Sequence, residues 1–222
     1  MEKNTIGVCE MLNTKVDLLK GNILKSLIIF AIPLFISNLF QQLYNTVDIM
    51  IVGNYLGDTS LAAIGASTAV YDLLVGFALG IGNGLSIVVA RSYGADDRKL
   101  LKKSVAGSII IGAFITIIIM VISILFLMPL LRLLNTPENI IEESYSYISM
   151  ITLFVGIMFA YNLCAGLLRA VGNSFMPLVF LIISSLLNIG LDILFITAFN
   201  MGVRGAAVAT IIAQGISVLL CL

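Results

Sequence analysis

The chain has 222 residues, of which 60% are hydrophobic and 11% charged, and its formal net charge is zero. A soluble domain of this length carries about 25% charged residues, so much of this protein's surface must face lipid. The neutral balance gives no electrostatic basis for binding nucleic acid. The sequence also has no His, the commonest metal ligand and general base.

Six apolar stretches are each long enough to cross a bilayer as a helix, which takes about 20 residues. Barrel strands alternate apolar and polar residues, and these stretches do not, so helices are favoured. We predict an all-α integral membrane protein, with an N-terminal segment 1–25 before a six-helix transmembrane region 26–222. The expected spans are roughly 26–52, 61–89, 104–131, 145–168, 174–198 and 203–222.

The positions of Lys and Arg predict the orientation, because cytoplasmic loops are enriched in both. Ten of the 12 basic residues fall in the segments on the N-terminal side of the membrane. Those ten are Lys3, Lys15, Lys20, Lys25, Arg91, Arg98, Lys99, Lys102, Lys103 and Arg169. Only Arg132 and Arg204 fall on the other side. We therefore expect a multi-pass protein of the cell membrane, with segment 1–25 in the cytoplasm.

The sequence stops at Leu222, inside an apolar run without a charged exit. This ending leads us to expect a part of a longer protein.

Three carboxylates fall inside the expected spans, at Asp48, Asp72 and Asp192. A carboxylate at the centre of a span costs about 2.5–3.5 kcal/mol on insertion scales, so such a residue faces a cavity or a partner rather than lipid. For Asp72 the sequence leaves two roles open, namely lining a cavity or making a structural hydrogen bond.

Asp48 ends a polar stripe that includes Gln41 and Asn45, whose spacing of four and three residues puts all three on one helix face. The stripe indicates a cavity wall, although polar packing against neighbouring helices is the alternative. In the same span Pro33 removes one backbone hydrogen bond and is expected to bend the helix.

Asn188 and Asp192 share one helix face at a spacing of four residues. Their span starts on the same side as that of Asp48, so both carboxylates fall in the outer half of the membrane and form one site if the helices are neighbours. Thr210 lies at a similar depth, and Asn162 lies nearer the middle of the membrane. Carboxylate, amide and hydroxyl oxygens suit a hard cation, for which Asp48, Asn188 and Asp192 are the candidate ligands. Adjacent carboxylates can instead share a proton.

Five segments, found from about residue 18 to the end, resemble the N-terminal half of the multidrug and toxic compound extrusion (MATE) exporters. They are Pro33–Ile36 with Tyr44–Asp48, Val89–Ala95, Ala165–Asn173, Leu187–Asp192 and Gly205–Thr210. The resemblance implies one lobe of a twelve-helix transporter, which exchanges Na⁺ or H⁺ for organic, often cationic, drugs. It maps the family's cation site to Asp48, Asn162, Asn188, Asp192 and Thr210.

The same resemblance implies a multidrug efflux antiporter rather than an enzyme, with no cofactor other than the coupling ion. Its expected partners are small organic drugs, membrane lipids and a second six-helix lobe, either in the same chain or from a second copy. Alternating access in this family rocks one lobe against the other, so the 222 residues alone are not expected to supply that motion.

Three other interpretations remain open. A lipid-linked oligosaccharide or polysaccharide flippase of the same superfamily would need cationic residues inside the spans, and these are scarce. An intramembrane aspartyl protease also uses two carboxylates, but its Gly-x-Gly-Asp signature is absent because Asp192 follows Ile189-Gly190-Leu191. The third interpretation is a truncated fragment that does not transport.

Overall fold

The computed structural model describes residues 23–221, so nearly all of the expected cytoplasmic segment 1–25 lies outside the described residues. Throughout the described range the secondary structure is helical. The elements are α2 (Ile23–Leu56), α3 (Asp58–Gly94), α4 (Arg98–Leu133), α5 (Glu138–Leu153), α6 (Val155–Ala170), α7 (Phe175–Ile193), the π-helix η1 (Leu194–Ala198) and α8 (Val203–Cys221).

Five of the helices in residues 23–221 are long and apolar enough to cross a membrane, and α5 with α6 makes a sixth if the pair is one span. These two helices are bent by 50° where they meet, at Phe154. The expected span 145–168 is therefore broken. The all-helical membrane architecture expected from the sequence is confirmed.

Helices α2, α3 and α4 are longer than the apolar stretches from which they were predicted. α3 has 37 residues, which at 1.5 Å per residue makes it about 55 Å long, whereas the hydrocarbon core of a bilayer is about 30 Å thick. The additional turns carry charged residues such as Arg91 and, at the start of α4, Arg98 and Lys102. A search for apolar runs misses these turns because charged residues also form helix readily.

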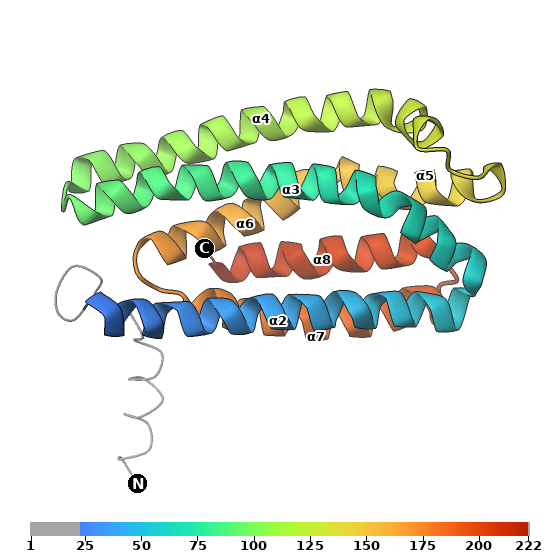
Figure 1. Ribbon diagram of the computed structural model, residues 1–222, viewed down its shortest axis with the longest axis horizontal. Helices are drawn as coiled ribbons and strands as arrows, with labels where there is room; N and C mark the ends of the chain where they lie inside the picture. Colours follow the sequence, from blue (N-terminus) through green and yellow to red (C-terminus); the bar gives the residue numbers. More distant parts are fainter. Residues whose placement is uncertain (1–22, 222) are drawn as a thin grey trace, which may run out of the picture.

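Sharp turns join the helices at the expected breaks. Gly57, between α2 and α3, has a φ of +83°, and Asp96, Asn135 and Asn200 also have positive φ, a conformation that Gly, Asn and Asp adopt most readily. The α3–α4 and α6–α7 turns lie at one end of the molecule, and the α2–α3, α4–α5 and η1–α8 turns lie at the other (Figure 1). Successive spans therefore run in opposite directions.

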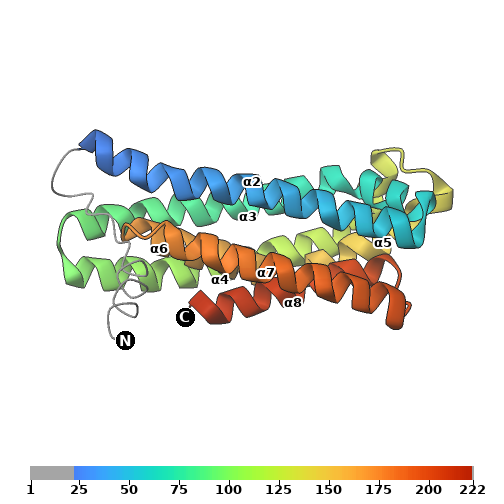
Figure 2. The same ribbon diagram turned by 90° about the horizontal axis from the view of Figure 1, so that it is seen from below.

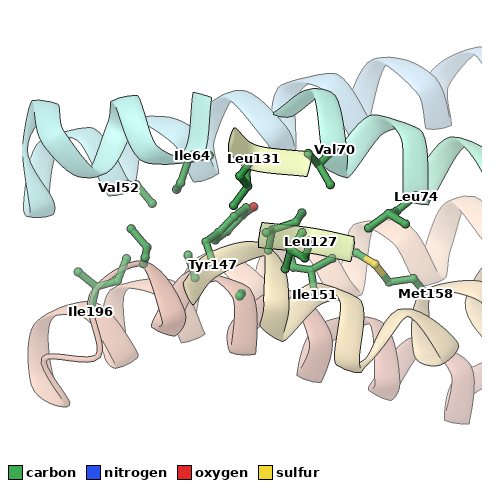
Figure 3. Packing of buried hydrophobic residues seen from close by; sticks show 14 of the residues in the cluster. Val52, Ile64, Val70, Leu74, Leu127, Leu131, Tyr147, Ile151, Met158 and Ile196 are labelled. Carbon is green, nitrogen blue, oxygen red and sulfur yellow. The ribbon is translucent and has the colours of Figure 1, made fainter. Parts of the chain in front are cut away.

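The helices form an elongated bundle, with most axes running roughly along its length (Figure 1 and Figure 2). α3 packs most extensively against α6, α4 and α5, whereas α2 packs mainly against α7, and α8 packs against α5, α6 and α7. A buried apolar cluster that includes Leu127, Tyr147 and Ile151 fills the space between these helices (Figure 3). Because α7 touches both α2 and α8, polar side chains on all three can meet.

Candidate functional site

Five polar residues from three helices meet in the interior of the bundle. α2 contributes Tyr44 and Asp48, α7 contributes Asn188 and Asp192, and α8 contributes Thr210. Asp192 is 0% exposed and Asn188 is 1% exposed. The structure thus brings Asp48, Asn188, Asp192 and Thr210 together, with Tyr44 beside them, as one cluster that we call the carboxylate cluster.

Asn188 and Thr210 hold Asp192 through a directed chain of hydrogen bonds. The amide nitrogen of Asn188 donates to Asp192 Oδ2 at 2.9 Å, and the amide oxygen accepts from the Thr210 hydroxyl at 3.2 Å and from the Thr210 N–H at 3.1 Å. In the opposite orientation of the Asn188 amide, its nitrogen donates to Thr210 Oγ1 at 3.2 Å. The amide oxygen then faces the Asp192 carboxylate, and neither group has a proton to donate. We assign the first orientation because a carboxylate only accepts.

The chain begins at Tyr44, whose hydroxyl lies 3.4 Å from Thr210 Oγ1. Because the single Thr210 proton is used on Asn188, Tyr44 must be the donor in this contact. The bonds therefore run from Tyr44 to Thr210, from Thr210 to Asn188 and from Asn188 to Asp192. This order fixes the orientation of Asp192 from three helices.

The carboxyl groups of Asp48 and Asp192 lie close enough to each other to interact directly. The Oδ1 atoms of both residues are nevertheless buried, and no donor in residues 23–221 reaches either of them. Buried polar atoms are normally satisfied, and an orphan at a concave site indicates a missing ion, proton or water. A small cation placed between the two carboxyl groups would satisfy both atoms.

A cavity of about 120 Å³ adjoins the cluster, and we call it the Asp48 cavity. At about 30 Å³ per molecule it has room for roughly four waters. Its polar lining residues are Tyr44, Asn45, Asp48, Thr68, Tyr71, Asp72, Tyr147 and Thr210. The structure therefore places Asp72, for which the sequence offered no partner, on the wall of the same cavity as Asp48.

A second, smaller cavity of about 20 Å³ lies on the other side of Tyr44 and includes Gln41 in its wall. It also touches Asn188 and Gln214, and the buried Oε1 atom of Gln214 has no partner in the described chain. This volume is about that of one water. The stripe expected on α2 is thus divided, with Gln41 in the small cavity and Asn45 and Asp48 in the large one.

Two candidates lie apart from the cluster. The Asn162 amide donates to Met158 O on its own helix at 2.8 Å, and its Cβ packs beside Gly82 of α3. Gly82 is ten residues beyond Asp72, or about 15 Å along the helix. Pro33 lies in the first third of α2, where the helix continues through it and Ser37 donates to its carbonyl at 2.8 Å.

The sequence interpretation overlooked three tyrosines that line the Asp48 cavity, namely Tyr44, Tyr71 and Tyr147. Aromatic residues inside an apolar span give no polar signal, since a tyrosine there usually fills space. Tyr44 follows the stripe spacing, three residues after Gln41 and four before Asp48, and this was the only available sign.

The site combines carboxylate, amide and hydroxyl groups, and within the part of the chain that the structure describes no Lys or Arg lines either cavity. Among residues 23–221 there is no group of three or more His, Cys, Asp and Glu that could hold a metal ion. Transition metals favour imidazole and thiolate ligands, whereas this oxygen set suits a hard cation or a proton. A polar ion-sized site within a bundle of spans is typical of a membrane transporter.

Comparisons with known proteins agree with this class. The family model MatE matches residues 33–194, and the chain belongs to that family, as its motifs predicted. It is 32% identical over 203 residues to a Bacillus subtilis protein described as "Probable multidrug resistance protein YpnP", covering 91% of this chain and 46% of the relative. It is 33% identical over 198 residues to "Probable multidrug resistance protein YoeA" of the same species, covering 87% and 43%.

The fold is also that of a solved multidrug transporter. The structure described as the outward-facing conformation of a multidrug resistance MATE family transporter of the MOP superfamily superposes with a TM-score of 0.86 at 29% identity, covering 94% of this chain and 46% of that one. The chain thus spans about half the length of the relatives it matches, consistent with the N-terminal half.

Proposed function

We propose that the chain is the cation-coupling half of an antiporter, which exchanges Na⁺ or H⁺ for organic cations across the cell membrane. The observation that carries this proposal is the direct contact of Asp48 with Asp192, each with an unsatisfied buried oxygen. The names of the relatives, which describe multidrug resistance, support drug export. No Lys or Arg from residues 23–221 lines either cavity, which argues against an anionic lipid-linked substrate.

The coupling ion is held between the two carboxyl groups, while Asn188 and Thr210 orient Asp192. If the ion is a proton, it forms the bond between the carboxyl groups, since two carboxylates have no donor. If the ion is Na⁺, the two Oδ1 atoms are its nearest ligands. In both cases binding neutralises a buried negative charge, which changes how α2 and α7 pack against each other.

The concentration gradient of the coupling ion drives export of a singly charged drug. One-for-one exchange of Na⁺ or H⁺ for a monocation moves no net charge, so the contribution of the membrane potential cancels. Each tenfold gradient of the ion supplies about 1.4 kcal/mol and sustains a tenfold gradient of the drug. The second half of the transporter, in the same chain or from a second copy, is needed for the rocking motion.

Dye export from vesicles tests the proposal. The full-length protein is reconstituted into lipid vesicles. Export of a fluorescent organic cation is then followed while a Na⁺ gradient or a pH gradient is imposed. We expect at least one gradient to drive export in the wild type and neither to do so in Asp48→Asn. Wild-type export rates in Asp48→Asn would overturn the proposal, and Asp58→Asn, at the start of α3, is the charge-matched control.

A further inference from the structure

The second carboxylate in the Asp48 cavity has no role in the proposed coupling site. Asp72 lines the cavity, is exposed, and makes no hydrogen bond or ion pair with any residue from 23 to 221. It lies in the middle of α3, 14 residues after Asp58, so about 21 Å of helix separate it from the outer turn. An unpaired carboxylate at this depth is expensive and indicates a partner from outside the described chain.

The cavity itself offers an independent sign of a ligand. The Tyr147 side chain is 8% exposed and lines the cavity, yet its hydroxyl makes no hydrogen bond with the described residues. Tyr71 and Tyr44 stand in the same wall, so aromatic rings and carboxylates surround the space. Aromatic faces attract organic cations, and quaternary ammonium groups are bound in this way.

Asp48 cannot take the charged group of an organic ligand as easily. Its carboxyl group contacts Asp192, and one of its oxygens is fully buried, so only a small ion reaches the pair. Asp72 and Asn45 both line the cavity and are both exposed, so an organic group can reach them. The cavity volume of about 120 Å³ suits the head of such a ligand, and the rest of the molecule remains outside.

We propose that Asp72, with Tyr71 and Tyr147, binds the cationic head of the exported compound at a subsite separate from the Asp48–Asp192 pair. This assignment rests on the proposed function and adds to it the residues that recognise the charge of the exported compound. The two sites share the wall formed by Tyr44 and Tyr71, so a cation bound at one repels a cation bound at the other. Such repulsion is a physical basis for exchange.

Equilibrium binding tests the assignment in the full protein in lipid nanodiscs. Tetraphenylphosphonium is the cationic probe, and triphenylphosphine oxide is the uncharged probe of similar shape. We expect Asp72→Asn to weaken binding of the cation by about tenfold, which is 1.4 kcal/mol, with binding of the uncharged probe unchanged. Asp72→Glu keeps the charge and should retain most of the affinity, and Asp58→Asn should match the wild type.

Each outcome decides a different point. The assignment of Asp72 is overturned if Asp72→Asn binds the cationic probe with wild-type affinity, or if its affinity for both probes falls equally. Neither result affects the proposed coupling site. Failure of the wild type to bind either probe contradicts the proposed function itself. If Asp72→Asn does not fold, the wild type is labelled with a photoreactive quaternary ammonium compound. Label within residues 68–75 supports the subsite, and its absence there overturns it.

Discussion

Asp48 of α2 and Asp192 of α7 lie side by side with their carboxyl groups close enough to interact, although no Lys or Arg from residues 23–221 lines the cavities beside them. Two acids in contact without a basic partner are unfavourable in lipid unless something positive joins them. We therefore expect the pair to bind and release a positive charge rather than to stabilise the fold. Asn188 and Thr210 constrain Asp192 through hydrogen bonds, so we expect Asp48 to be the member that moves.

The first prediction concerns Asn188, the link between Thr210 and Asp192. Asn188→Ala leaves Asp192 Oδ2 without its donor and the Thr210 hydroxyl without its acceptor, and each buried unsatisfied group costs about 1–3 kcal/mol. We expect a lower thermal unfolding midpoint and the loss of cation-driven dye export. Ser108→Ala is the control, because Ser108 is buried in α4, outside the lining of both cavities, and its hydroxyl donates to Ser104 O of its own helix. Normal coupling in Asn188→Ala would contradict the orienting role.

Much of the carboxylate cluster could be predicted from the sequence, because helical spacing and membrane depth are both readable there. The spacing of Asn188 and Asp192 and the matching depth of Asp48 predicted that these residues form one site if α2 and α7 are neighbours. Whether two helices are neighbours depends on the packing of the whole bundle and cannot be read from spacing. For the same reason the sequence did not predict that Tyr147 of α5 lines the cavity.

Two other features had no adequate signal. The break at Phe154 lies two residues before Gly156, in a stretch without Pro, and a single Gly in an apolar run does not by itself predict a bend of 50°. Asn162 was included through family resemblance, and its amide bonds to its own helix. Its place in the cation site stays a prediction.

The second prediction concerns the contact of α4 with α6 at Gly112. A Cβ atom added at Gly112 would lie 2.2 Å from Phe159 Cζ and 2.3 Å from Cε1, and Phe159 is itself 5% exposed. Overpacking of this kind costs about 1–3 kcal/mol, so Gly112→Ala should lower the thermal unfolding midpoint in detergent. The double variant Gly112→Ala/Phe159→Leu should recover part of the loss.

Gly107→Ala is the control for this measurement, because it lies on the same helix and a Cβ atom there meets nothing within 4 Å. Alanine is favoured over glycine inside a helix by about 1 kcal/mol, so this variant should unfold at the wild-type midpoint or above it. Equal midpoints for Gly112→Ala and Gly107→Ala would show that the α4–α6 contact is looser than the structure indicates.

The third prediction concerns the orientation of the bundle. The α3–α4 and α6–α7 turns lie at one end of the bundle (Figure 1), next to Lys99 and Arg169 respectively. The α4–α5 turn, next to Glu138, lies at the other end. Since basic loops stay in the cytoplasm, we expect the acidic end to face outward. In a variant with its three native cysteines replaced by Ser, a membrane-impermeant maleimide should label Asn139→Cys on intact cells. Lys99→Cys should be labelled only after permeabilisation, and the reverse pattern would invert the direction of transport proposed above.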